Sequence, residues 1–345
     1  MKGLSVVLVV MFLGLAGCAG LPQATSEPSS PTTTPTLTPS LTLPSFTEKN
    51  VFTNGKGPVY SQEWSPDGKL LAAAGYREVN LWDLSTGKRV VLQGHTDFVW
   101  GVSWSPDGLS LASAGQDNVC LWNASTATLV AILPTAWAFC LGWSPDGRTL
   151  AVGALNGELQ LWNAATGEKK QSLQPPQPGP MICLAWSPDG ETIACGYLTG
   201  EIVLWHSASG VPLRTIRDYT DFRCDVNGLS WSPDGKILVT GHQDGLVRFW
   251  SPDDGSLTRA ISAHQGWVRG VRWSPDGRTL VTSGEDRRAC LWDSGSGKKL
   301  AEVTQGNLPV WSVSWSQDGK LISTGSGEYE SERAGAAIVW AVPSY

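Results

Sequence analysis

Four histidines and seven cysteines are the side chains of this 345-residue chain best suited to metal binding or nucleophilic catalysis. Their spacing includes no His-x-x-x-His or Cys-x-x-Cys pair, so the sequence predicts no metal site. The chain also has no Gly-x-Ser-x-Gly motif, no glycine-rich phosphate loop and no dinucleotide-binding fingerprint. These observations predict that the protein is not an enzyme and has no catalytic residues and no cofactor.

Cys18 has a clear chemical context, because it follows a short export signal. Met1 and Lys2 give a positive start, and residues 4–15 form an apolar run of about a dozen residues. This run is shorter than the ~20 residues that span a bilayer and has the length of a signal-peptide core. It leads into Leu15-Ala16-Gly17-Cys18, which resembles the bacterial lipoprotein signal.

The resemblance implies that residues 1–17 are cleaved as a signal peptide and that Cys18 carries a diacylglyceryl thioether, often with an added N-acyl chain such as palmitate. Two or three acyl chains anchor a protein stably where one does not. The protein is thus expected outside the cytoplasm, lipid-anchored to a membrane of the bacterial cell envelope. An ordinary secretory signal with an incidental cysteine is the alternative.

Residues 18–47 are expected to tether a folded head to that membrane. Residues 21–47 contain six Pro, eight Thr and five Ser. Such a composition cannot bury a core and stays extended and solvated. At ~3.1 Å per residue, residues 21–47 reach at most about 80 Å.

A pentapeptide, Trp-Ser-Pro-Asp-Gly, organises the remaining residues 48–345. It begins at Trp64, Trp104, Trp143, Trp186, Trp231 and Trp273, and a copy with Gln for Pro begins at Trp315. The copies are 40, 39, 43, 45, 42 and 42 residues apart, and a period in this range indicates a stacked-repeat or ring architecture. Pro, Asp and Gly in this order favour a type I turn, and the alternating apolar residues on both sides predict a β-hairpin.

A second tryptophan ends the third predicted strand of each repeat, at Trp82, Trp122, Trp162, Trp205, Trp250, Trp292 and Trp340. A fourth apolar run follows in the first six repeats, so each unit has the four antiparallel strands of one propeller blade. The seventh repeat ends at Tyr345 without a fourth strand, and residues 48–53 have no blade of their own. We therefore predict an all-β, seven-bladed propeller whose N-terminal strand completes blade seven and closes the ring. An open ring with a frayed edge is the alternative.

The chain resembles the WD-repeat β-propeller family over about 300 of its 345 residues. The second tryptophan is followed by Asp83 and Asp293, and Gly94-His95 matches the family's Gly-His pair. The resemblance implies a buried hydrogen-bonded set of His, Ser or Thr, Asp and Trp in two repeats: His95, Ser113, Asp117 and Trp122, and His264, Thr282, Asp286 and Trp292. The fifth repeat keeps Thr240, Asp244 and Trp250 but has Phe222 in place of His, and the other four lack the set.

Loop lengths vary mainly in the loops that enter each blade and in one loop of the seventh repeat, which propeller topology places on one face. Variation confined to one face usually marks the binding face. Large side chains lie there four or six residues before the first tryptophan, where WD-repeat proteins often contact partners. The candidate partner-binding residues are Tyr60, Phe98, Trp100, Trp137, Trp267, Arg269 and Trp311, with Gln116, Gln243 and Glu285 at the rim. Packing between blades is the alternative role for these rings.

The function predicted from these features is a non-catalytic scaffold that binds a protein or peptide partner. A net charge of −6 and a pI near 5.3 argue against a nucleic-acid partner. The alternatives are a small-molecule or carbohydrate site in the central channel, and an enzyme with an unrecognised site. The sequence leaves open whether Cys183 and Cys195 form a disulfide, which export would permit.

Overall fold

The structure, a computed structural model, describes residues 43–217, 225–329, 331 and 333–343. Within these residues the chain forms 27 β-strands and no helix, and hence no helix that could cross a bilayer. The predicted signal peptide, Cys18 and most of the predicted tether lie outside the described residues. The strands are arranged in six antiparallel sheets.

The first sheet has seven strands: β2 (Gln62–Trp64), β3 (Leu70–Ala74), β4 (Tyr76–Asp83), β5 (Arg89–Trp104), β6 (Ser110–Gly115), β7 (Val119–Asn123) and β8 (Thr128–Leu133). The sequence predicted two separate four-stranded blades here, but the structure joins the strands of both in one sheet. Strand β5 joins the two units because it pairs with β4 through its first part and with β6 through its second part. Phe98 pairs with Tyr76 at the junction, so the strand is not interrupted.

Four sheets of four consecutive strands follow. They are β9 (Ala138–Trp143), β10 (Thr149–Ala154), β11 (Leu159–Asn163) and β12 (Lys169–Leu173); β13 (Met181–Trp186), β14 (Thr192–Tyr197), β15 (Glu201–His206) and β16 (Pro212–Arg217); β17 (Val226–Trp231), β18 (Leu238–His242), β19 (Leu246–Trp250) and β20 (Leu257–Ser262); and β21 (Val268–Trp273), β22 (Thr279–Gly284), β23 (Arg288–Asp293) and β24 (Lys299–Thr304).

The last sheet combines the two ends of the described chain. It contains β25 (Val310–Trp315), β26 (Leu321–Ser326), β27 (Ala336–Ala341) and, as its fourth strand, β1 (Thr47–Thr53). Thr47 pairs with Ala341 and Thr53 with Ala336. Phe46, just before β1, is buried in the core beside this sheet.

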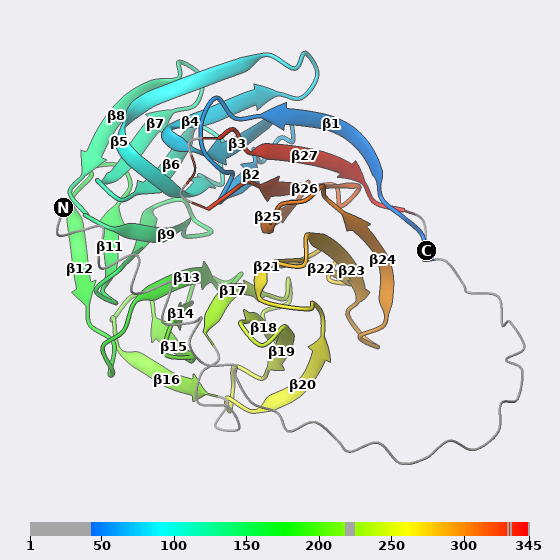
Figure 1. Cartoon of the computed structure of the whole chain (residues 1–345). Helices are drawn as coiled ribbons and strands as arrows, with labels where there is room; N and C mark the ends of the chain where they lie inside the picture. The colour runs from blue at the N-terminus through cyan, green and yellow to red at the C-terminus, as the bar shows by residue number, and fades with distance from the viewer. Residues whose placement is uncertain (1–42, 218–224, 330, 332, 344–345) are drawn as a thin grey trace, which may run out of the picture. The chain divides into compact units, whose positions relative to one another are not determined.

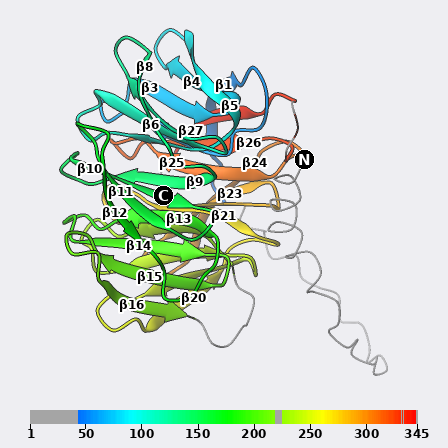
Figure 2. The ribbon, with the colours of Figure 1, turned by 90° about the vertical axis from the view of Figure 1, so that its left-hand side faces the viewer.

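The sheets lie around a common centre, with β2, β9, β13, β17, β21 and β25 innermost (Figure 1). Figure 2 shows the same strands from the side. In the second repeat the second part of β5 takes this place, because β5 contacts both β2 and β9. The other innermost strands contact one another in chain order, and β25 contacts β2. The Gln62 side chain bridges these two ends, because its amide donates to the Ser323 carbonyl at 3.0 Å.

Each repeated turn is held by the same hydrogen bonds. In the first, Ser65 Oγ donates to Asp67 Oδ1 at 2.7 Å and accepts from Leu70 N at 2.9 Å. The hydrogen bond from Ser65 is the main cause that lowers the pKa of Asp67. Gly68 has φ 71°, a left-handed conformation that glycine adopts without strain. The pentapeptide is therefore explained by the needs of the turn.

The two sets of tryptophans have different structural roles. The first set ties neighbouring repeats together: the Trp104 indole N–H donates to the Glu63 carbonyl at 3.2 Å, and that of Trp143 to the Ser103 carbonyl at 3.0 Å. Corresponding bonds are made by Trp186, Trp231 and Trp315. All seven tryptophans of the second set are buried in the cores between the sheets.

Candidate protein-binding face

The candidate side chains lie where the innermost strands begin. The position four residues before the first tryptophan holds Tyr60, Trp100, Phe139, Arg269 and Trp311, and the position six residues before it holds Phe98, Trp137 and Trp267. In β5, β9, β21 and β25 the residue four before the tryptophan is the extra residue of a β-bulge, because the pairing skips it. Bulges redirect side chains and are frequent beside functional sites.

These side chains form one continuous group, which we call the aromatic arc: Trp267, Arg269, Trp311, Tyr60, Phe98, Trp100 and Phe139. Tyr60 is at its middle, with its ring centroid 4.6 Å from that of Trp100 and 5.6 Å from that of Trp311. Trp100 continues the arc by stacking on Phe139 at 5.2 Å. These separations are typical of attractive aromatic pairs, so residues from four sheets form a single surface feature.

Arg269 extends the arc to the sheet that begins with β21. Its guanidinium carbon lies 4.2 Å from the ring centroid of Trp267 and 4.6 Å from that of Trp311. Glu285 forms an ion pair with it, and the Arg269 side chain is only 12% exposed. Burial lowers the pKa of Arg269 and Glu285 opposes that shift, but an arginine stays charged in proteins. The arc therefore contains a fixed, clamped cation.

The arc has a buried floor and a more open upper layer. Trp100 and Phe139 are only 7% and 8% exposed, so these two rings mainly support their neighbours. Tyr60, Phe98 and Trp311 are partly exposed. A molecule bound to this face would therefore touch the partly exposed rings, and the two buried rings would hold them in place.

Trp137 adjoins the arc in a strained conformation. Its φ is 59°, which is uncommon for a bulky residue, and its backbone is fixed by hydrogen bonds to Gln116 O at 3.0 Å and from Leu155 N at 2.9 Å. The Trp137 side chain is partly exposed, and none of the ring contacts among the described residues includes its indole. Strained residues of this kind are concentrated at functional sites.

The three predicted rim residues are not equally placed. The backbone N–H of Gln116 donates to the Phe98 carbonyl at 2.9 Å, and that of Glu285 donates to the Trp267 carbonyl at 3.0 Å. Gln116 and Glu285 therefore each bond to a member of the arc. Gln243 bonds instead to Asp225, at 3.3 Å, beside residues 218–224, which the structure does not describe.

The structure brings the four residues of each predicted hydrogen-bond set together. In the sixth repeat, Trp292 Nε1 donates to Thr282 Oγ1 at 2.9 Å, and Thr282 Oγ1 and His264 Nε2 are 2.8 Å apart. His264 Nδ1 lies 2.8 Å from Asp286 Oδ1. A carboxylate only accepts, so His264 donates through Nδ1 and accepts from the Thr282 hydroxyl through Nε2. Every member of the chain is satisfied.

The second repeat has the same arrangement. His95 Nε2 is 2.7 Å from Ser113 Oγ, and Trp122 Nε1 donates to that oxygen at 2.8 Å. Asp117 lies 2.7 Å from His95 Nδ1. Burial alone would raise the pKa of Asp117, but the hydrogen bond from His95 and those from backbone N–H groups bring it down to about 2.

The fifth repeat replaces its missing histidine by another route. His242 Nε2 lies 2.7 Å from Thr240 Oγ1, which also accepts from Trp250 Nε1 at 2.7 Å. His242 is on the same strand as Thr240, whereas His95 is on β5 and His264 is in the loop before β21. The sequence interpretation missed this substitution. Its signal was a histidine two residues after the strand threonine, where both side chains share one face of the strand.

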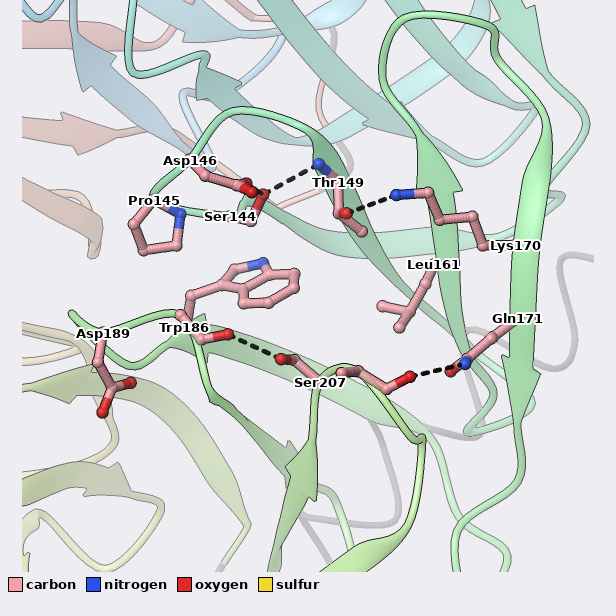
Figure 3. Close-up of a pocket in the computed structure, with 12 residues that line it drawn as sticks. Ser144, Pro145, Asp146, Thr149, Leu161, Lys170, Gln171, Trp186, Asp189 and Ser207 are labelled. Carbon is pink, nitrogen blue, oxygen red and sulfur yellow. Dashed lines mark hydrogen bonds between the residues drawn. The ribbon is translucent and has the colours of Figure 1, made fainter.

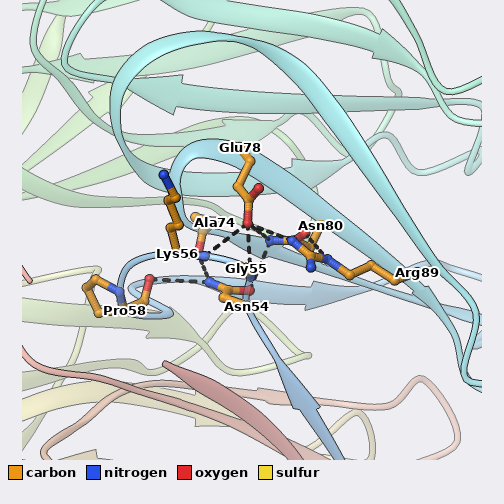
Figure 4. A network of polar contacts seen from close by, with 8 residues as sticks. All are labelled: Asn54, Gly55, Lys56, Pro58, Ala74, Glu78, Asn80 and Arg89. Carbon is orange, nitrogen blue, oxygen red and sulfur yellow. Dashed lines mark hydrogen bonds and ion pairs between the residues drawn. The ribbon is translucent and has the colours of Figure 1, made fainter. Parts of the chain in front are cut away.

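The first repeat uses amides and an ion pair in place of a histidine (Figure 4). Asn80 Nδ2 donates to Asn54 Oδ1 at 3.0 Å, and both residues are buried. Arg89 pairs with Glu78 at 2.7 Å, and Glu78 accepts from the backbone N–H of Gly55 at 3.0 Å. This network fixes the segment between β1 and β2 on the first sheet.

A groove of about 320 Å³ lies at the other end of the strands, between the sheets that begin with β9 and β13 (Figure 3). Trp186 lies across it, and its indole N–H is already bonded to the Gly142 carbonyl. Lys170 Nζ donates to Thr149 Oγ1 at 2.9 Å, and Ser207 Oγ donates to the Gly190 carbonyl at 2.7 Å. These polar groups are paired within the protein, so the groove offers few free groups to a ligand.

The cysteines that the structure describes are all free thiols. Cys183 pairs across the hairpin with Gly196, whereas Cys195 pairs with Leu184. Side chains of adjacent registers point to opposite faces of a sheet, so a Cys183–Cys195 disulfide does not form in this geometry. Within the described part of the chain, no group of three or more His, Cys, Asp or Glu is placed to hold a metal ion.

Comparison with known proteins agrees with this architecture. A family model described as the IFT122 first beta-propeller matches residues 58–331, a range that covers most of the chain and the whole aromatic arc. No curated protein matches the chain. The chain therefore belongs to this family of WD-repeat β-propellers.

Proposed function

We propose that this protein is a membrane-anchored, non-catalytic scaffold that binds a protein or peptide partner through the aromatic arc. The observation that carries the proposal is the arc itself, in which partly exposed rings from several sheets lie together and two of them, Trp267 and Trp311, contact a clamped arginine. Tryptophan, tyrosine and arginine dominate the energetics of protein interfaces. Bulged strand positions and the strained Trp137 at the edge of the arc support the same conclusion.

The proposed scaffold is a closed ring of seven blades. The pairing of β1 with β27 and the bond between Gln62 and Ser323 support closure. Closure would fix the arc, because its centre, Tyr60, belongs to the first repeat and its neighbour Trp311 to the last. A rigid arc would lose little conformational entropy when a partner binds.

The proposed anchor is a lipid on Cys18, in a protein exported to the bacterial cell envelope. The charged start, the short apolar run and the four residues that end in Cys18 support it. Labelling of cells with an alkyne analogue of palmitate tests this part. The expected result is label on the full chain and none on Cys18→Ser; equal labelling of both proteins would contradict the anchor.

Co-purification tests the binding face. The full chain would be extracted in detergent from its own cells and compared with a Trp137→Ala/Trp267→Ala double variant, and partners would be quantified by mass spectrometry. The matched control is Leu109→Ala, which removes a 64% exposed side chain in the turn between β5 and β6. We expect a partner retained by wild type and by the control, and lost from the double variant. Equal recovery from all three proteins would contradict the role of the arc.

A further inference from the structure

The residue before each first tryptophan lines one central cavity of about 360 Å³. These seven residues are Glu63, Ser103, Gly142, Ala185, Ser230, Arg272 and Ser314. Five of them are small, and two carry opposite charges. Small side chains line most of the wall, so they leave space for a ligand, and Glu63 and Arg272 supply the only two charges among these seven residues. Its volume is at the lower end of the roughly 300–1,000 Å³ of small-molecule sites.

Glu63 presents a carboxylate to this cavity from the first repeat. One carboxylate oxygen accepts from the Trp104 backbone N–H at 2.8 Å. Burial raises the pKa of Glu63 to about 7, and the Trp104 N–H and the charge of Arg272 limit this rise. Near neutral pH the group is therefore poised between its charged and neutral forms, and a cation placed beside it would favour the carboxylate.

Arg272 presents a guanidinium from the sixth repeat. Its Nη1 donates to the Leu229 carbonyl at 3.2 Å and to the Val271 carbonyl at 3.0 Å. Among the ion pairs of the described residues, none joins Arg272 to Glu63 or to another carboxylate. Arg272 is exposed and Glu63 is partly exposed. Two opposite charges thus face one cavity without an ion pair between them, so a ligand that carries both charges would complement the site.

We propose that the central cavity binds a small zwitterion of the amino-acid type, with its carboxylate on Arg272 and its ammonium group on Glu63. Such a ligand pairs both charges at once. The hydroxyl groups of Ser103, Ser230 and Ser314 lie in the same ring and offer further hydrogen bonds. An uncharged sugar would leave both charges without a counter-charge, and the first-set tryptophans are already used in packing between repeats. This site is separate from the aromatic arc and does not depend on partner binding.

Isothermal titration calorimetry on the full chain in detergent tests the proposal. The probes are glycine, L-alanine and L-serine, with acetate and methylammonium as ligands that carry one charge each. A ligand with one charge makes only one of the two charge-assisted hydrogen bonds, and loss of the other lowers the affinity by about 10- to 100-fold. We expect at least one zwitterion to bind at least about tenfold more tightly than acetate or methylammonium. Absence of binding by all three amino acids, or acetate binding as tightly as they do, would overturn the proposal.

Two substitutions that each remove one charge assign the roles of Arg272 and Glu63. Arg272→Gln is expected to remove binding of both the zwitterion and acetate, and Glu63→Gln to reduce zwitterion binding to the level of acetate. Arg278→Gln, which changes an exposed arginine in the adjacent turn, is the matched control and is expected to bind as wild type. A Glu63→Gln variant that keeps wild-type affinity for the zwitterion would refute the assignment.

Proton release gives a readout that needs no variant, so the proposal stays testable if a substituted protein does not fold. Binding of an ammonium group would shift Glu63 to its carboxylate form, so zwitterion binding would release protons near pH 7. Titrations in two buffers of different ionisation enthalpy measure this release. Affinity is expected to rise between pH 6 and pH 8. An affinity that is independent of pH over this range would contradict the role of Glu63.

Discussion

Thr282→Val removes one hydroxyl from the hydrogen-bond chain of the sixth repeat without changing the shape of the side chain. That hydroxyl is fully buried; it accepts from Trp292 and lies 2.8 Å from His264. The substitution leaves two buried polar groups without partners, and each such group costs about 1–3 kcal/mol. We therefore expect the free energy of unfolding to fall by about 2–6 kcal/mol.

Thr279→Val is the matched control, because Thr279 is in the same strand, β22, and is also buried. Its hydroxyl has no hydrogen-bond partner among the described residues, so the control is expected to be neutral or slightly stabilising. Urea unfolding followed by tryptophan fluorescence gives both free energies. Equal effects of the two substitutions, or a loss below about 1 kcal/mol for Thr282→Val, would refute the energetic role of the chain.

Three further results are expected. Arg287→Gly should raise the free energy of unfolding by about 0.5–1 kcal/mol, because Arg287 is held at φ 69° and glycine adopts this conformation without strain; a lower melting temperature would contradict this. Trp104→Phe should destabilise by about 1–2 kcal/mol through the lost indole N–H bond, whereas Trp64→Phe should cost less, because the Trp64 N–H has no partner in the described structure; equal losses in urea unfolding would exclude an effect of that bond. The pKa of Asp117 is lowered in the folded protein to about 2, so its stabilising contribution is present above pH ~4 and is lost as the pH falls toward 2; an acid titration in which His95→Gln leaves this loss unchanged would argue against that linkage.

The sequence predicted the parts of the fold that depend on short-range chemistry. The turn residues and the two sets of tryptophans repeat with a fixed period, so the sheets and their hairpins could be anticipated. The continuous strand β5 could not, because the pairing of Phe98 with Tyr76 is decided by the packing of two neighbouring repeats. The substitution by His242 was also missed, since the search followed the spacing of the loop histidines.

The sequence predicted which residues share the candidate face, but not how their side chains lie relative to one another. Equal spacing before the first tryptophan indicated which side chains share a rim, but the β-bulges that turn them there leave no mark in composition. The separation of Trp100 and Phe139, as floor, from Tyr60 and Trp311 depends on contacts between sheets. The sequence shows that Glu63 and Arg272 are the two charged residues at a position that is otherwise small. Only the structure shows that both side chains line the same cavity.

Site-specific photo-crosslinking tests the central claim most directly. A photoreactive phenylalanine analogue would be placed at Trp137, beside the arc, and in a second protein at Leu109, in the exposed turn between β5 and β6. Irradiation of cells that make the full chain is expected to give a discrete crosslinked protein from position 137 and none from position 109. Crosslinks from position 109 alone, or the same products from both positions, would contradict binding through the aromatic arc.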